Sequence, residues 1–188
     1  IRDSYGAADA ERVIIAMGSV TEAIRETIDH LTAQGEKVGL VAVHLYRPFS
    51  AKHFLAAVPA TAKTIAVLDR TKEPGANGEP LYLDVKECFY GKENAPVIVG
   101  GRYGLGSNDT TPAQILAVYE NLALPEPKNQ FTLGIVDDVT FTSLPQKEEV
   151  AMGGEGMFEA KFYGLGADGT VGANKNSVKI IGDNTNKH

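Results

Sequence analysis

The chain has 188 residues, of which 43% are hydrophobic and 22% are charged, and its formal net charge is −6. This composition is typical of a globular protein, and the acidic balance argues against nucleic acid or an anionic membrane as the main partner. The single cysteine, Cys88, excludes an internal disulfide, and one thiol is too few for a zinc or iron–sulfur site held by this chain.

Short apolar runs alternate with segments of helical periodicity along the first 140 or so residues. The predicted strands cover residues 12–17, 37–44, 63–69, 95–100 and 131–137. The predicted helices cover residues 19–35, 50–57, 79–90 and 111–122. Apolar strands that alternate with helices predict an α/β fold, in which a five-stranded, parallel or mostly parallel sheet lies between two helix layers.

Two helix starts carry recognisable signals. Ser19 followed by Glu22 has the spacing of a capping box, in which each side chain would bond the backbone amide of the other residue. Thr111 precedes Pro112, which predicts an N-cap residue followed by proline at the first helical position.

The last part of the chain predicts a second, incomplete unit. Residues 143–157 contain Pro145, a charged run and paired glycines, and we interpret them as a linker between residues 1–142 and residues 158–188. A strand is expected from Phe158, followed by a glycine loop and a helix. One βα unit cannot bury a core by itself. Because the chain opens at Ile1 and stops soon after this loop, we expect it to be a piece of a longer enzyme.

The loop from Gly164 to Gly169 has the G-x-G-x-x-G pattern between a predicted strand and a predicted helix. Glycines allow backbone amides to approach an anion, and a helix N-terminus favours negative charge. The pattern indicates a phosphate cradle, although it also fits a tight turn without a ligand. The loop is not a Walker A motif, because no Gly-Lys-Ser/Thr closes it.

Two further loops, at residues 69–75 and 100–109, follow predicted strands and combine charges with glycines. Arg102 could hold a carboxylate or phosphate, pair with Asp109 or Asp69, or lie across a domain interface, and the structural or interface roles are favoured. No histidine has a partner at ligand spacing and no nucleophile elbow is present. We therefore expect no catalytic residue and no metal site in the first domain.

Five segments are similar to the interior of the large single-chain pyruvate:ferredoxin (flavodoxin) oxidoreductases. They span residues 41–50, 68–84, 100–114, 131–140 and 164–182. The resemblance implies that residues 1–142 form a transketolase C-terminal-like domain with a mixed sheet that has one antiparallel strand. It also implies that residues 158–188 are the truncated start of a gamma-type domain that contacts coenzyme A (CoA).

The resemblance implies an activity for the intact enzyme, which converts pyruvate and CoA to acetyl-CoA and CO2 and passes electrons to ferredoxin or flavodoxin. The implied cofactors are thiamine diphosphate, Mg and iron–sulfur clusters, none of them bound by this piece, which we expect to be inactive alone. A cytoplasmic homodimer without nucleic-acid or membrane partners is expected. The implied CoA-contacting residues are Gly166, Asp168, Gly169, Thr170, Gly172, Asn174 and Lys175.

Two other functions fit parts of the pattern. A stand-alone dinucleotide-binding module would use Gly164 to Gly169 and needs an acidic residue about twenty positions later, at the end of a second strand. Asp183 has that spacing but follows helix-like sequence. A purely structural domain without a ligand is the second alternative.

Overall fold

A computed structural model describes residues 2–145, 147–148 and 160–186. The strands are β1 Arg2–Gly6, β2 Arg12–Ala16, β3 Val38–Val43, β4 Thr64–Asp69, β5 Val97–Arg102 and β6 Phe131–Thr132. The helices are α1 Val20–Ala33, α2 Ala51–Ala57, α3 Pro80–Phe89, the 3₁₀ turn η1 Leu105–Ser107, α4 Pro112–Ala123 and α5 Thr170–Asn184. Contacts within the chain define two compact units, Ile1–Met152 and Gly153–His188.

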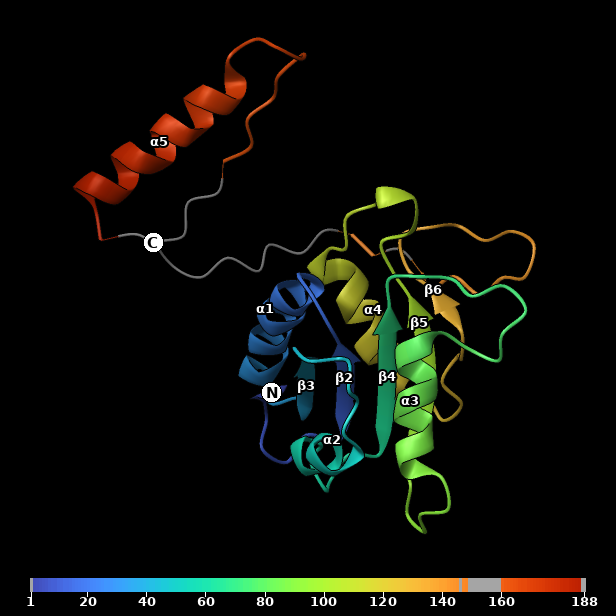
Figure 1. The fold of residues 1–188 in the computed structure, drawn as a ribbon. Coiled ribbons are helices and arrows are strands. Elements are labelled where there is room, and N and C mark those ends of the chain that lie inside the picture. The colour runs from blue at the N-terminus through green and yellow to red at the C-terminus, as the bar shows by residue number, and fades with distance from the viewer. Residues whose placement is uncertain (1, 146, 149–159, 187–188) are drawn as a thin grey trace. The chain divides into compact units, whose positions relative to one another are not determined.

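The first unit is a six-stranded mixed sheet with the strand order β1-β3-β2-β4-β5-β6 (Figure 1). Strands β2 to β6 are parallel to one another, and β1 pairs antiparallel with β3. Helices α1 and α4 cover one face and α2 and α3 cover the other. The predicted three-layer, mostly parallel fold is therefore confirmed, with six strands in place of five.

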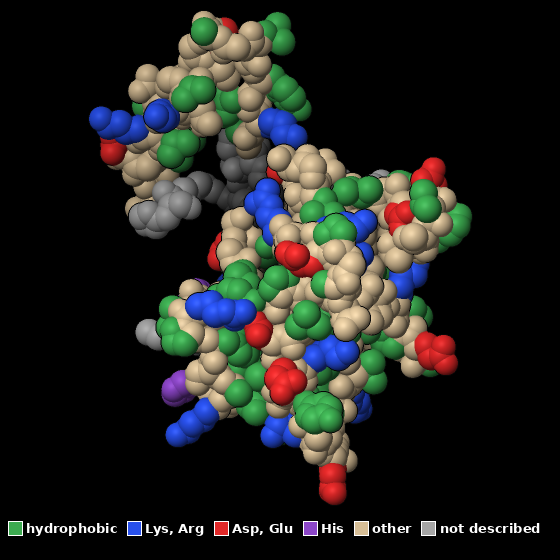
Figure 2. Space-filling view, turned by 45° about the vertical axis from the view of Figure 1, so that its right-hand side comes forward, with side chains coloured by type: hydrophobic (Ala, Val, Ile, Leu, Met, Phe, Trp, Pro, Cys, Tyr) green, Lys and Arg blue, Asp and Glu red, His purple; other side chains and the backbone are tan. Residues whose placement is uncertain are grey.

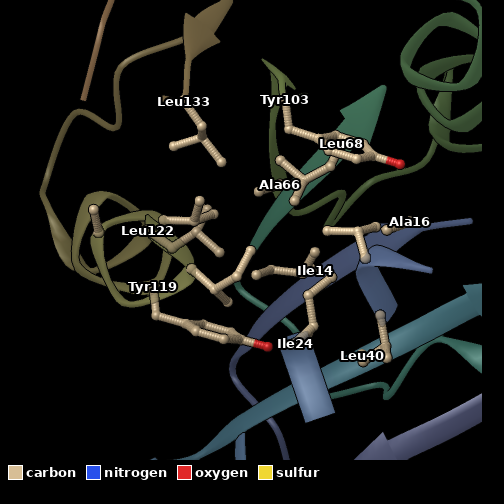
Figure 3. Packing of buried hydrophobic residues seen from close by; sticks show 14 of the residues in the cluster. Ile14, Ala16, Ile24, Leu40, Ala66, Leu68, Tyr103, Tyr119, Leu122 and Leu133 are labelled. Atoms are coloured by element: carbon tan, nitrogen blue, oxygen red, sulfur yellow. The ribbon is translucent and has the colours of Figure 1, made fainter. Parts of the chain in front are cut away.

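Alternate residues of each central strand supply two separate cores. Ile14 and Ala66 face α1 and α4, whereas Val13 and Ile65 face α2 and α3. Figure 3 shows the first of these cores, where Tyr119 of α4 lies among the side chains of the central strands. The Tyr119 hydroxyl is buried and donates to the Gly39 carbonyl oxygen at 3.0 Å. Burial of strands on both faces explains why their sequences are continuous apolar runs.

Strand β1 was not predicted, because its sequence has no apolar alternation. Its residues pair with β3 from Arg2↔Val43 to Gly6↔Gly39, so its conformation is set by a neighbour that is distant in sequence. The predicted strand at residues 131–137 is wrong in its length, because the ladder covers only Phe131 and Thr132. Gly134 has a φ of +72°, which turns the chain out of the extended conformation.

Strand β5 continues through Gly100 to Arg102, beyond the predicted end at residue 100. Two neighbouring aromatic rings make glycine necessary here. A Cβ on Gly101 would lie 2.3 Å from two ring atoms of Phe131, and one on Gly100 would lie 3.1 Å from the Tyr82 ring. The glycine run that resembles a loop in sequence is therefore partly a strand on which aromatic side chains pack directly.

The predicted capping box at α1 is wrong. Ser19 has helical dihedral angles and its side chain makes no capping bond, while the Thr21 hydroxyl donates to the Gly18 carbonyl oxygen at 2.7 Å. At α4 the expected positions are confirmed, with Thr111 extended and Pro112 in the first turn, although the Thr111 side chain does not bond an amide.

The predicted linker is only partly described. Ser143 forms a parallel bridge with Thr132, and Leu144 is buried in the core shared by α1 and α4. Leu144, two residues past the predicted end of the first domain at 142, thus packs with the core of the first unit. Residues 146 and 149–157 lie outside the described residues. No helix in the described part of the chain is long and apolar enough to cross a bilayer.

We predict that Gly101→Ala destabilises the first unit by about 1–3 kcal/mol, because the new methyl group would collide with the Phe131 ring. Urea unfolding followed by circular dichroism measures this loss. Gly182→Ala is the matched control, since a Cβ there meets no atom within 4 Å. An unchanged unfolding midpoint for Gly101→Ala would contradict the packing described.

Candidate functional site

Asp168 is the centre of the glycine loop at the start of α5. Its carboxylate accepts the Leu165 amide at 2.7 Å, the Thr170 amide at 3.0 Å and the Thr170 hydroxyl at 2.6 Å. These hydrogen bonds lower the pKa of Asp168 to about 2, with the Thr170 hydroxyl as the largest cause. The loop thus binds an anion in this structure, and the anion is its own carboxylate.

The glycines of the loop have the conformations that the sequence pattern predicts. Gly166 and Gly169 have φ values of +104° and +83°, and a Cβ on either would meet no atom within 4 Å, so their outer sides are open. By contrast, a Cβ on Gly164 would lie 2.6 Å from the Thr170 hydroxyl oxygen, so this glycine allows the turn to close.

The other predicted contact residues lie further along α5. Gly172, Asn174 and Lys175 are exposed, and neither polar side chain has a hydrogen-bond partner among the described residues. The structure therefore joins Asp168 and Thr170 by hydrogen bonds, whereas Asn174 and Lys175 take no part in these bonds. Sequence reasoning missed the Leu165 amide, because helix-start patterns predict bonds from amides that follow the acceptor, and Leu165 precedes Asp168.

The strand predicted before this loop is wrong in its described part. Residues 160–164 form no ladder with any described residue, and residues 158–159 lie outside the described range. Asp183 lies in the last turn of α5 and not at the end of a second strand. A dinucleotide module requires a strand before the loop and an acidic residue after the next strand, so this alternative has no structural support.

A second group of polar residues lies where β4 and β5 end. Asp69, the last residue of β4, is 6% exposed, and its two carboxylate oxygens accept the amides of Leu81 and Tyr82 at 3.1 Å each. These amides belong to the first turn of α3, which has no intrahelical acceptor for them. Burial raises the pKa of the Asp69 carboxyl, and the two amides oppose this effect.

Arg102, the last residue of β5, is paired with Glu79. The Arg102 Nε and Glu79 Oε1 atoms are 2.6 Å apart, and the two side chains are only 12% and 1% exposed. Arg102 also donates to the Gln130 carbonyl oxygen just before β6. The favoured structural role therefore fits, but the predicted partners, Asp109 and Asp69, are wrong, because Asp69 is occupied by α3 and Glu79 lies closer.

Charges of both signs are mixed on the visible face of the first unit and form no basic patch there (Figure 2). Among the described residues, no three His, Cys, Asp or Glu side chains lie close enough together to hold a metal ion. The candidates for a functional site described so far are therefore two, the glycine loop at the start of α5 and the polar cluster at the carboxyl ends of β4 and β5.

These features define a mostly parallel, three-layer α/β domain followed by a separate helical segment. The sequence matches the family model described as pyruvate:ferredoxin oxidoreductase core domain II over residues 10–115, and the chain belongs to this family.

The relatives that this chain matches are much longer proteins. It is 62% identical over 181 residues to the pyruvate-flavodoxin oxidoreductase of Klebsiella pneumoniae. The matched region covers 96% of this chain and 16% of that protein. It is 58% identical over 186 residues to the pyruvate:ferredoxin oxidoreductase of Moorella thermoacetica, covering 99% of this chain and 16% of that protein. The chain thus spans about one sixth of the relatives it matches.

A solved structure of the 2-oxoglutarate:ferredoxin oxidoreductase from Magnetococcus marinus, with 2-oxoglutarate, coenzyme A and succinyl-CoA bound, is also similar. The match has 20% sequence identity and a TM-score of 0.48, and it covers 66% of this chain and 20% of that chain.

Replacing Arg102 by methionine should destabilise the first unit by about 3–5 kcal/mol, because Glu79 would remain buried without its partner. Chemical unfolding measures the change. The double variant Glu79→Gln with Arg102→Met should recover part of the loss. Lys63→Met breaks the exposed Lys63–Glu11 pair and should cost at most about 1 kcal/mol. Equal losses from Arg102→Met and Lys63→Met would contradict the buried pair.

The Asp168 loop should keep its hydrogen bonds at neutral pH and lose them only in strong acid. Its folded pKa of about 2 lies below the ordinary value of 3.8, so the stabilising contribution is present above pH 3.8 and is lost as the pH falls through about 2. An NMR titration of the Asp168 carboxyl carbon and the Thr170 amide measures the midpoint. A midpoint near 4 for both signals would show that the carboxylate does not hold the loop.

Proposed function

We propose that this chain is the domain II segment, with the start of the next domain, of an enzyme that oxidises pyruvate with CoA to acetyl-CoA and CO2. Ferredoxin or flavodoxin would accept the electrons. The observation that carries this proposal is the 62% identity to a pyruvate-flavodoxin oxidoreductase across 96% of this chain. An identity this high along the whole segment supports a shared role within the longer protein.

The cysteine content bears on where the clusters of such an enzyme would be held. An iron–sulfur cluster requires several cysteines, and the sequence has one. The proposal therefore assigns thiamine diphosphate, Mg and the clusters to other parts of the longer protein, and it assigns no catalytic residue to this chain.

For the glycine loop we propose a contact with the phosphate end of CoA. Gly166 and Gly169 are open on their outer sides, and Gly172 places a second stretch of bare backbone in the first turn of α5. Thr170, Asn174 and Lys175 offer a hydroxyl, an amide and a positive charge in the same segment. A phosphate would take over the amides that Asp168 now holds, because both are anions that suit a helix N-terminus.

This arrangement changes the role that we give to Asp168. A carboxylate repels phosphate, so Asp168 is better suited to hold the conformation of the loop through the Leu165 and Thr170 amides than to contact the ligand. The homodimer, the cytoplasmic location and the boundary between residues 1–142 and 158–188 are further parts of the proposal. They rest on the resemblance to the family.

A chimeric enzyme tests the proposal. We would replace the matching segment of the Klebsiella pneumoniae protein by this chain and assay pyruvate oxidation, and we expect activity to be retained. Lys175→Gln in the chimera should raise the KM for CoA about fivefold and leave the KM for pyruvate unchanged, since an exposed charge contact contributes about 1 kcal/mol. Lys179→Gln, on the same helix, is the matched control.

The possible outcomes separate the two parts of the proposal. A folded chimera without pyruvate oxidation would contradict the enzyme assignment. An active chimera in which Lys175→Gln and Lys179→Gln have the same KM for CoA would contradict the role of the loop while leaving the enzyme assignment in place.

A further inference from the structure

The sheet of the first unit has a switch point between β2 and β4. The chain leaves β2 through α1 toward β3 on one side, and after β3 it crosses through α2 to β4 on the other side. Helices α1 and α3, which follow β2 and β4, consequently lie on opposite faces of the sheet. Open α/β sheets form a crevice outside the carboxyl ends of the strands at such a point, and ligands bind there.

A cavity of about 250 Å³ opens at this place. Ser19 lines it from the segment after β2, Arg70 from the segment after β4, and Tyr103, Gly104 and Thr110 from the segment after β5. The floor is fixed, because Tyr103 is 7% exposed and its hydroxyl donates to the Met17 carbonyl oxygen at 3.2 Å.

Four polar side chains that line this cavity have no partner among the described residues, three of them possible donors to an anion and the fourth the carboxylate of Asp109. The Arg70 guanidinium makes no ion pair or hydrogen bond there, and the hydroxyls of Ser19 and Thr110 make none. Every other arginine whose side chain is described bonds an acidic side chain, namely Arg12, Arg25, Arg47 and Arg102. Arg70 is therefore the exception within residues 3–145, 147–148 and 160–186.

The Arg70 side chain is exposed and lies beside Gly104. A Cβ on Gly104 would lie 2.9 Å from Arg70 Nε and 3.3 Å from Cδ and Cγ, so the side chain lies along the bare backbone of Gly104. Gly104 has a φ of +61°, a conformation that favours glycine. The neighbouring carboxylate of Asp69 forms no ion pair with Arg70 among the described residues, and its two oxygens accept amides of α3.

We propose that this crevice is a binding site for a small anionic group, a phosphate or a carboxylate, held by Arg70 together with Ser19 and Thr110. A guanidinium binds such groups through two parallel hydrogen bonds, and hydroxyls complete the set of donors. The volume corresponds to roughly eight water molecules, which suits a small anion or the charged end of a larger molecule. This site is separate from the loop at Asp168 and does not depend on the proposed function.

Asp109 also lines the cavity and modulates the site. No ion pair joins it to Arg70 among the described residues. Its negative charge opposes anion binding, so its removal should strengthen binding. This gives the proposal a test in which the affinity rises, which a merely damaged protein would not produce.

The test is an NMR titration of the 188-residue chain with inorganic phosphate and, separately, with acetate. We expect saturable shifts of the Val20 and Gly104 amides with a dissociation constant of about 1 mM for the anion that fits. Arg70→Gln should weaken binding at least tenfold, whereas Lys72→Gln, an exposed lysine in the same loop, should leave it unchanged. Asp109→Asn should tighten binding about threefold, as expected for one nearby charge screened by water.

The relative affinities of phosphate and acetate identify which anion the site prefers. Thermal unfolding of each variant shows that it is folded. Absence of saturable shifts with both anions would overturn the proposal and would leave Arg70 as a contact for another protein surface. Equal binding by the Arg70→Gln and Lys72→Gln variants would also overturn it, because the affinity would then come from net charge alone.

Discussion

The buried carboxylate of Asp69 is the contact on which the carboxyl edge of the sheet depends. It holds the first turn of α3 by two amides, and this places Glu79, one residue before the helix, against Arg102 of β5. Arg102 in turn holds the Gln130 carbonyl oxygen at the entry to β6. A charge buried this deeply is costly unless it is fully bonded, so β4, α3, β5 and β6 are fixed together.

The bonds made by Asp69 and Glu79 also decide which arginine side chain at this edge of the sheet remains available to a ligand. Asp69 and Arg70 are adjacent in sequence and opposite in charge, yet they form no ion pair among the described residues, and the Asp69 carboxylate bonds the amides of α3 instead. Arg102, the more obvious candidate in sequence, is occupied by Glu79. Arg70, which has no partner in the part of the chain that the structure describes, lines a cavity at the switch point of the sheet, a place where open α/β sheets bind ligands.

Asp168 repeats the chemistry of Asp69 in a different environment. Both carboxylates satisfy amides at the start of a helix, Asp69 for α3 and Asp168 for α5. Burial raises the pKa of Asp69, whereas the exposed Asp168 has a pKa lowered to about 2, because water keeps its charged form solvated while the hydrogen bonds favour it. The exchange of this carboxylate for a phosphate, which we propose for the exposed loop, would leave Asp168 in water, whereas Asp69 is buried.

The sequence by itself determined the order of helices and strands from β2 to β6, the start of α4 at Pro112 and the resemblance to the family, because apolar periodicity and local motifs are properties of neighbouring residues. Only the tertiary structure decided that Arg2–Gly6 is a strand, that Gly100 and Gly101 extend β5, and that Arg102 pairs with Glu79. Each of these depends on a partner far away in the chain. The periodicity of a short segment carries no information about such a partner.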